Sequence, residues 1–225
     1  MQYVPLHLHT ENSLLDGAIR IKELCKFAKE NDMPAVAITD HGNMYGAIQM
    51  YETAKEMGLK PLIGCEFYVY DGDITEKNPA KTHPYHLVLI AKDQTGYKNL
   101  VKLVSIAKCQ GMYYKPRINH ELIEQYHEGL ICLSACVQGE VAQGFIQGEK
   151  EKSYEAAKFY KGLFGEDYYI ELQDHGLEKQ KMSNPGLIEL AKELDIKMVF
   201  TNDSHYLRKE DADWHDTLLC LQTNA

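Results

Sequence analysis

The chain has 225 residues and a formal charge of −9 at pH 7, from 24 Lys and Arg against 33 Asp and Glu. With 44% hydrophobic and 25% charged residues, the composition is that of a globular chain, which excludes disordered and fibrous classes. The acidic balance disfavours a broad surface that follows DNA phosphates. The acidic balance does not exclude a metal site, because a bound divalent ion neutralises the charge of carboxylates.

The apolar stretches are short, such as residues 87–91 and 130–133, and fall well below the roughly 20 residues that a bilayer crossing needs. The first residues lack the basic and apolar regions of a secretory signal. Six cysteines are scattered without the spacing of a small disulfide scaffold. We therefore expect reduced thiols, a cytoplasmic location and no membrane partner.

Short β-forming runs alternate with longer segments of helical period along the whole chain. The expected strands are residues 3–8, 35–39, 62–70, 85–91, 130–134, 168–172 and 197–201. The expected helices, each following a strand, are residues 18–31, 45–57, 97–109, 154–164 and 187–194. Residues 71–83 are polar and predict a loop, and residues 111–125 predict an excursion outside the repeat.

Repeated strand–helix units favour a mostly parallel sheet. Seven such units in about 200 residues predict a closed or nearly closed α/β barrel that is smaller than the usual eight-stranded form. An open, doubly wound sheet is the alternative.

Histidines and acids collect where the expected strands end. His7 and His9 lie at the end of the first strand, and the alternation of a strand places both imidazoles on one face. Asp203 and His205 form a second pair of this kind after the last strand. In an α/β barrel the carboxyl ends of the strands share one rim, so these groups are expected to converge there.

Metal binding is the function that this pattern predicts. Imidazole, carboxylate and thiolate together suit zinc, and manganese or iron fit where carboxylates dominate. The candidates exceed what one ion can use, so two or three divalent ions are expected. The candidate ligands are His7, His9, Asp16, His41, Glu66, His86, Cys136, Asp203 and His205.

Each of these residues also has a structural interpretation. A single strand histidine is more commonly a hydrogen-bonded core residue, and Cys136 could be a small buried apolar side chain. His83 is an alternative to His86, and Asp40 and His175 are candidates for orienting ligands from behind. The remaining histidines lie in polar helical contexts and are expected on the surface; they are His120, His127 and His215.

A short segment combines aromatic and cationic side chains. Tyr114, Lys115 and Arg117 have the composition of a site for a phosphodiester strand with stacked bases. Arg117 is the stronger phosphate ligand, since its planar guanidinium can bind two oxygens. The alternative is a solvated loop with packed tyrosines. No glycine-rich phosphate loop occurs in the sequence, so a nucleotide cofactor is not expected.

Four motifs resemble those of the polymerase and histidinol phosphatase (PHP) superfamily. They are PLHLHT at residues 5–10, TDHG at 39–42, GCE at 64–66 and NDSHY at 202–206. The resemblance implies a distorted seven-stranded (β/α)7 barrel whose rim binds up to three metal ions through the nine residues named above.

Three further stretches are similar to the N-terminal PHP domains of bacterial DNA polymerase III alpha subunits. They are HLVLIAK at residues 86–92, KPRI at 115–118 and LSAC at 133–136. This resemblance implies that residues 1–225 form one PHP domain, excised from a larger replicative polymerase whose polymerase domains are absent. The partners would be a DNA 3′ end, the remainder of the alpha chain and replisome subunits.

In family members that keep the ligands, the domain is associated with metal-dependent 3′–5′ exonuclease proofreading. We therefore expect phosphodiester hydrolysis at a DNA 3′ end, with two ions clamping the phosphate. Asp203, His9 and His41 are the catalytic candidates, with Asp203 or a histidine that holds no metal accepting the proton of the attacking water. Alternatives are a phosphomonoesterase, a pyrophosphatase, or a non-catalytic scaffold that the metals stabilise.

Overall fold

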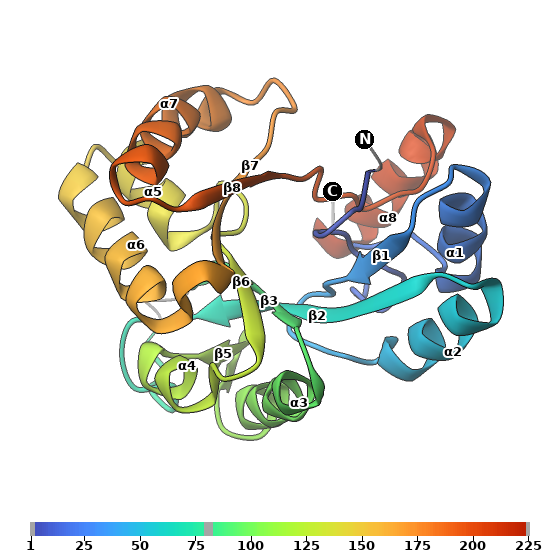
Figure 1. Ribbon diagram of the computed structural model, residues 1–225, viewed down its shortest axis with the longest axis horizontal. Helices are drawn as coiled ribbons and strands as arrows, with labels where there is room; N and C mark the ends of the chain where they lie inside the picture. Colours follow the sequence, from blue (N-terminus) through green and yellow to red (C-terminus); the bar gives the residue numbers. More distant parts are fainter. Residues whose placement is uncertain (1–2, 79–82, 224–225) are drawn as a thin grey trace. The chain divides into compact units, whose positions relative to one another are not determined.

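The computed structural model describes residues 3–78 and 83–223. The chain divides into two compact units, residues 1–65 with 203–225 and residues 66–202. The boundary falls within strand β2 (Lys60–Val69), so this strand contributes residues to both units. The elements of each unit are labelled in Figure 1.

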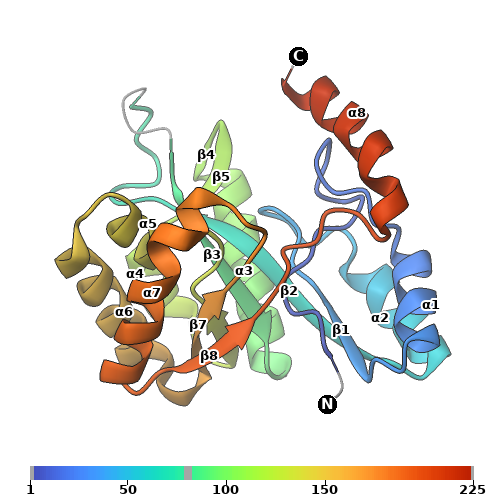
Figure 2. The same cartoon turned by 90° about the horizontal axis from the view of Figure 1, so that it is seen from above.

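In the first unit, two helices pack on each other beside a parallel pair of strands. These helices are α1 (Ile21–Glu30) and α2 (Ala47–Met57), which lie side by side in Figure 2. Strand β1 (Ala35–Ile38) pairs in parallel with the first part of β2. The same unit ends with the 3-10 helix η2 (Lys209–Asp211) and helix α8 (Ala212–Thr223).

Helix α1 shows why the sequence pattern was informative. Ile21, Leu24, Cys25 and Ala28 are buried, at the i, i+3, i+4, i+7 spacing of one helical face. Helix α2 ends at Gly58, whose left-handed conformation (φ 75°) closes the last turn. The predictions of these two helices are confirmed.

The expected first strand, residues 3–8, is not a regular strand. Its residues accept two hydrogen bonds from the β1 region, from the Ala37 amide to the Pro5 carbonyl and from the Thr39 amide to the Leu8 carbonyl. Leu8 also forms an isolated parallel bridge with Ser204. Pro5 has no amide hydrogen, which interrupts the ladder that a regular strand needs.

The second unit is built on a sheet whose order is β4-β5-β2-β3-β6-β7-β8. The strands that follow β2 are β3 (Tyr85–Ala91), β4 (Met112–Tyr113), β5 (Lys115–Ile118), β6 (Leu130–Leu133), β7 (Tyr168–Leu172) and β8 (Lys197–Phe200). The pairs β2–β5, β6–β7 and β7–β8 are parallel. The pair β3–β6 is antiparallel, which corrects the expectation of a repeating parallel order.

The reason for the antiparallel pair lies in the expected excursion at residues 111–125. This segment forms the antiparallel hairpin β4–β5 and the short helix α4 (His120–Tyr126). It therefore adds a reversal of the chain between β3 and β6, which the strand–helix repeat did not include.

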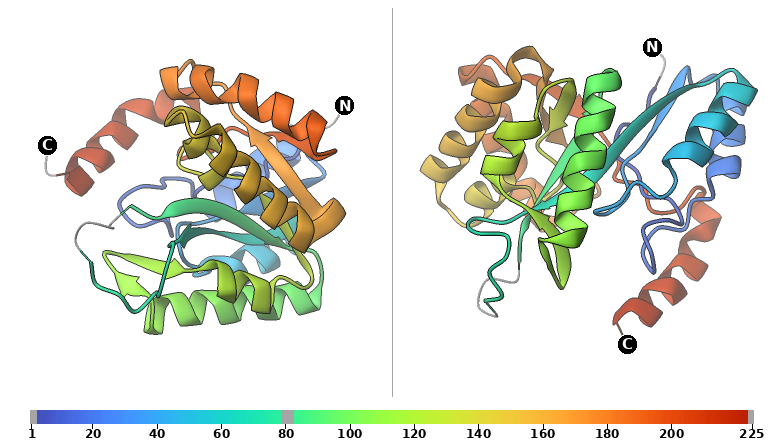
Figure 3. Two further views of the ribbon diagram at one scale, coloured as in Figure 1. Left: turned by 90° about the vertical axis from the view of Figure 1, so that its left-hand side faces the viewer. Right: turned by 90° about the horizontal axis from the view of Figure 1, so that it is seen from below.

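Helices cover the strands of the second unit. Besides α4, they are α3 (Gln94–Cys109), α5 (Glu140–Ile146), α6 (Lys150–Phe164), the 3-10 helix η1 (Gly165–Asp167) and α7 (Glu178–Glu193). Helix α5 packs against α6 and α7 (Figure 1), and α3 runs along β3 and the β4–β5 hairpin (Figure 3). Helices α4, α5 and α8 are not among the predicted helices, and α7 begins nine residues before the predicted 187–194.

The α/β class is confirmed, and six of the seven expected strands lie within two residues of their predicted positions. The closed seven-stranded barrel stays a prediction. Of the predicted loop at 71–83, residues 79–82 lie outside the described part of the chain. No helix in the described ranges has both the length and the apolar run needed to span a bilayer.

Candidate metal centre

Six of the nine predicted ligands lie in the first unit, within residues 7–16, just after β1 and in the turn at 203–205. They are His7, His9, Asp16, His41, Asp203 and His205. Backbone hydrogen bonds fix these loops, from the His9 amide to the Ser204 carbonyl (2.8 Å) and from the Ala18 amide to the His205 carbonyl (2.7 Å). Segments from both ends of the chain are thereby held together in one unit.

Three imidazoles form the centre of this group. The ring of His9 stacks against those of His41 and His205, with centroid separations of 4.0 and 4.3 Å, and the centroids of His41 and His205 are 5.8 Å apart. One ring nitrogen from each of the three lies within 4.8 Å of the others, close enough to share a metal ion. The group is largely buried, and His9 is fully enclosed.

Asp203 lies next to the imidazoles of His7 and His9. Its Oδ1 lies 3.3 Å from Nε2 of His7 and 3.0 Å from Nε2 of His9, and these two nitrogens are 3.2 Å apart. Asp203 has a left-handed backbone (φ 47°), a conformation that aspartate adopts more readily than most residues. The turn at 202–205 therefore brings the carboxylate and His205 to the same group.

Asp16 pairs with the other two histidines of the unit. Its Oδ2 lies 2.7 Å from Nε2 of His41 and 3.6 Å from Nε2 of His205. Burial acts to raise the pKa of Asp16, but hydrogen bonds with His205 and His41 outweigh it and hold the pKa well below its usual value. Burial acts to lower the pKa of His205, and the two carboxylates Asp16 and Asp203 raise it overall.

A buried carboxylate lies behind these imidazoles. Asp40 accepts hydrogen bonds from the Thr10 amide (2.7 Å), the Thr10 hydroxyl (2.8 Å) and the Ser13 hydroxyl (2.8 Å). Burial raises the pKa of Asp40, and the bonds from Ser13 and Thr10 oppose that rise. Asp40 fits the orienting role that the sequence suggested for it.

The remaining three predicted ligands lie together in the second unit. Oε1 of Glu66 is 2.9 Å from Nδ1 of His86, and Sγ of Cys136 is 3.7 Å from the same nitrogen. The rings of His86 and Tyr68 are nearly perpendicular, with their centroids 5.1 Å apart. His83 is exposed, so His86 is the histidine that accompanies Glu66.

The three predicted substrate-binding residues differ in exposure. Tyr114 is 77% exposed, and Lys115 is exposed with its Nζ 5.2 Å from the ring centre of Tyr68. Arg117 is instead 1% exposed, and its side chain lies 4.4 Å from the ring centre of Tyr70. Its guanidinium donates to the carbonyls of Ile74 and Glu76 at 2.7 Å and of Gly111 at 3.1 Å. A buried guanidinium bound in this way holds backbone loops, so the predicted phosphate contact of Arg117 finds no support.

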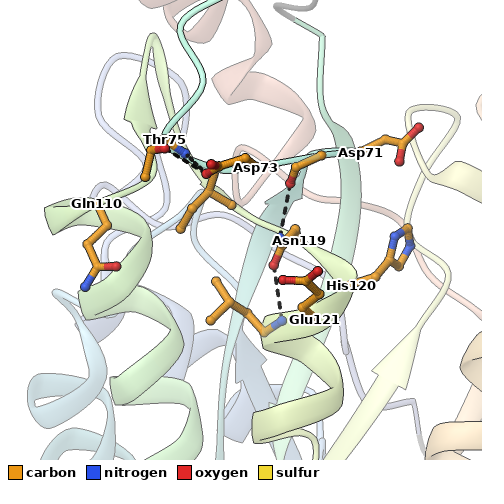
Figure 4. A pocket seen from close by; sticks show the side chains of 10 residues that line it. Asp71, Asp73, Thr75, Gln110, Asn119, His120 and Glu121 are labelled. Carbon is orange, nitrogen blue, oxygen red and sulfur yellow. Dashed lines mark hydrogen bonds between the residues drawn. The ribbon is translucent and has the colours of Figure 1, made fainter.

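A cleft of about 660 Å³ opens between the loop after β2 and the start of α4 (Figure 4). It contains none of the predicted metal ligands. Its lining includes the carboxylates of Asp71, Asp73 and Glu121, and none of its lining residues in the described part of the chain is a lysine or arginine. An anionic substrate would be repelled there, so the cleft does not suit a phosphate ester.

Sequence reasoning missed two residues that support the centre. His215, expected on the surface, is 8% exposed, and its Nε2 lies 2.8 Å from the Asp16 carbonyl. Ser13 contacts both His9 and Asp40 through its hydroxyl. The polar context of α8 concealed His215, whereas Ser13 lies between the predicted ligands His9 and Asp16, and this position was a usable signal.

Comparison with known proteins gives one family. A family model described as "PHP domain" matches residues 5–175. DNA polymerase III subunit alpha of Deinococcus radiodurans is 46% identical over 233 residues, which covers 100% of this chain. The corresponding subunit of Treponema pallidum is 47% identical over 227 residues, which covers 99% of this chain.

The matches cover only part of each relative. This chain spans 18% of the Deinococcus protein and 19% of the Treponema protein. A solved structure of an amidohydrolase from Chromobacterium violaceum with bound sulfate and no metal has a TM-score of 0.56 at 13% identity, and the match covers 96% of both chains. That likeness supports the α/β fold alone.

Proposed function

Because the chain belongs to the PHP domain family, we propose that it is the metal-dependent phosphoesterase domain of a DNA polymerase III alpha subunit. Its proposed activity is the removal of nucleotides from DNA 3′ ends, a 3′–5′ exonuclease that proofreads during replication. The observation that carries the proposal is the convergence of His9, His41 and His205 with Asp16 and Asp203. The remainder of the alpha chain and the replisome are the proposed partners.

The donor set fits divalent metal ions. Imidazole nitrogens and carboxylate oxygens suit zinc, manganese and iron, and the thiol of Cys136 adds a preference for zinc. The six ligands of the first unit would bind one or two ions, and Glu66, His86 and Cys136 would bind a further one. Such ions supply a nucleophilic water near neutral pH and stabilise the charge of the leaving oxygen.

The side chains of the first unit have distinct proposed roles. Asp203 is 18% exposed at its side chain, so it can accept the proton of the attacking water. His9 and His41 would orient the bound ions for the reaction. Ser13 holds the ring of His9, and Asp16 holds the ring of His41. Asp40 is not proposed as the proton acceptor, because it is 1% exposed and its oxygens are held by Thr10 and Ser13.

Tyr114 and Lys115 remain the proposed substrate contacts. Tyr114 offers an exposed ring for base stacking, and Lys115 offers a cation for the phosphodiester backbone. With Arg117 buried and the chain acidic, the affinity of these 225 residues for DNA is expected to be weak and to fall with salt.

The test is hydrolysis of a 5′-labelled oligonucleotide in the presence of Mn²⁺ or Zn²⁺. We expect stepwise shortening from the 3′ end with release of deoxynucleoside monophosphates. Asp203→Asn should lower the rate by about 10²-fold or more, the usual contribution of a general base. Asp195→Asn is the matched control, because Asp195 is an exposed aspartate that also has a left-handed backbone (φ 51°).

Other products would indicate a different hydrolytic activity. Free phosphate released from small phosphate esters would indicate a phosphomonoesterase, and cleavage of pyrophosphate alone would indicate a pyrophosphatase. An Asp203→Asn variant as active as the Asp195→Asn control would remove Asp203 from the mechanism.

One observation favours a second candidate, the metal-stabilised scaffold. The six ligands of the first unit come from residues 7–16, 41 and 203–205, so bound ions would crosslink distant parts of the chain. This candidate predicts that a chelator lowers the melting temperature of a chain that hydrolyses none of these substrates.

A further inference from the structure

Behind the imidazoles of the first unit, a directed series of hydrogen bonds ends on the buried carboxylate of Asp40. The Thr10 amide donates to Oδ1, and the Thr10 hydroxyl donates to Oδ2. The Thr10 hydroxyl itself accepts from the amide of Asn12 (3.2 Å) and from its side-chain nitrogen (2.9 Å). Every donor in this part of the network therefore points toward Asp40.

The Ser13 hydroxyl is the branch of this network that reaches the candidate metal centre. A serine hydroxyl has one proton, and that of Ser13 is donated to Oδ1 of Asp40 at 2.8 Å. Oγ of Ser13 also accepts the His41 amide, at 3.1 Å. Toward Nδ1 of His9, which lies 3.2 Å away, it can therefore only accept a hydrogen bond.

We infer that Ser13 and Asp40 are positioning residues that keep a proton on Nδ1 of His9, so that Nε2 is the ring nitrogen left for a metal ion. This inference rests on the proposed metal site, because the lone pair of Nε2 is what a divalent ion would bind. That nitrogen points to the other ligands, 3.2 Å from Nε2 of His7 and 3.0 Å from Oδ1 of Asp203.

His205 provides an internal comparison. Its Nδ1 lies 2.8 Å from the carbonyl oxygen of Asp203, which can only accept, so the same tautomer follows from a backbone group. No substitution of a side chain removes that carbonyl. A change at Ser13 should therefore alter the tautomer of His9 and leave that of His205 unchanged.

The experiment is ¹⁵N spectroscopy of the histidine rings in the 225-residue chain, first without metal and then with Zn²⁺. The couplings between ring nitrogens and ring protons distinguish the two neutral tautomers, and a His9→Gln variant identifies the His9 signals. We expect His9 with its proton on Nδ1 in the unsubstituted chain. Ser13→Ala should shift His9 toward the other tautomer while His205 keeps its signals.

The second readout is Zn²⁺ affinity, measured by competition with a chromophoric chelator. Loss of a group that orients a metal ligand typically weakens binding about 10–100-fold, and we expect this loss in Ser13→Ala. Ser153→Ala is the matched control, since Ser153 is equally buried and its hydroxyl donates to the Val141 carbonyl at 2.8 Å in the second unit. The control should keep both the His9 signals and the affinity.

Two results would overturn the inference. One is a His9 that carries no proton on Nδ1 in the unsubstituted chain, which needs no variant to fold. The other is a Ser13→Ala chain with unchanged His9 signals and unchanged Zn²⁺ affinity. Failure of the proposed hydrolysis is a separate result, because a chain that binds Zn²⁺ through the Nδ1–H tautomer of His9 but cleaves nothing supports this inference and not the exonuclease.

Discussion

The Nε2 atom of His41 lies 2.7 Å from Oδ2 of Asp16, and Nε2 of His205 approaches the same oxygen to 3.6 Å. One carboxylate therefore joins a loop near the start of the chain to the loop after β1 and to the turn before α8. His215 holds the backbone of Asp16 from the other side, with Nε2 2.8 Å from its carbonyl oxygen. Asp16 is thus the residue on which the arrangement of the first unit's ligands depends.

Asp16→Asn tests this dependence. The amide keeps the size of the side chain but removes its charge, so two imidazoles lose their anionic partner and a metal ion loses a ligand. We expect at least a tenfold loss of Zn²⁺ affinity, the lower end of the range for groups that only orient ligands. The control is Asp32→Asn, an exposed aspartate of the same unit, and equal affinity in the two variants would exclude Asp16 as a ligand.

Removal of metal should lower the thermal stability of the chain. Ions that bind only the folded state at about 100 times their dissociation constant stabilise it by about 2.7 kcal/mol. For a chain of this size, that corresponds to a melting temperature about 5–11 °C lower after chelation. Calorimetry with and without a chelator measures the difference, and restored Zn²⁺ should reverse it. An unchanged melting temperature would argue against bound ions.

Arg117→Met should destabilise the second unit. The substitution keeps an unbranched side chain but removes the donors to the carbonyls of Gly111, Ile74 and Glu76. The Gly111 carbonyl keeps the Arg117 amide as a donor, whereas the carbonyl of buried Ile74 loses the guanidinium donor, which costs about 1–3 kcal/mol, so we expect a loss of this size in urea unfolding. Lys115→Met, two residues earlier and exposed, should change stability by about 0.5 kcal/mol or less.

The same pair of variants tests substrate binding. Lys115→Met should weaken DNA binding, whereas Arg117→Met should affect it only through folding. An Arg117→Met chain of normal stability that no longer binds DNA would restore the phosphate role predicted from the sequence.

His120 should make part of the stability depend on pH. A hydrogen bond with Glu140 raises the pKa of His120 above 6.5, against the opposing effect of burial. The folded state therefore holds this proton more tightly than the unfolded chain. Its contribution is complete below about pH 6.5, the unfolded value, and is lost as the pH rises through the higher folded pKa.

Urea unfolding of the unsubstituted chain and of His120→Gln between pH 6 and 9 measures this contribution. The stability difference between them should shrink as the pH rises. Tyr160 donates to the same Glu140 oxygen at 2.9 Å and remains in both proteins. Parallel pH profiles would mean that the His120–Glu140 pair contributes nothing.

The local parts of the fold were predictable because they depend on neighbours in the sequence. The spacing of Ile21, Leu24, Cys25 and Ala28 predicted a helix with one buried face, and Gly58 predicted where α2 ends. The antiparallel entry of β6 beside β3 was not predictable in this way. It depends on how residues 111–125 fold between α3 and β6, which no periodicity records.

The sequence by itself determined the α/β class and the identity of the ligand-type residues, because strand alternation and motif spacing place such side chains at strand ends. Only the tertiary structure decided which groups they form, with six predicted ligands in the first unit and Glu66, His86 and Cys136 together in the second. It also decided that Arg117 is buried, that His215 holds Asp16, and that Ser13 connects Asp40 to His9. The physical reason is that charge and hydrogen-bonding capacity belong to a residue, whereas burial and the choice of partner arise when distant segments pack together.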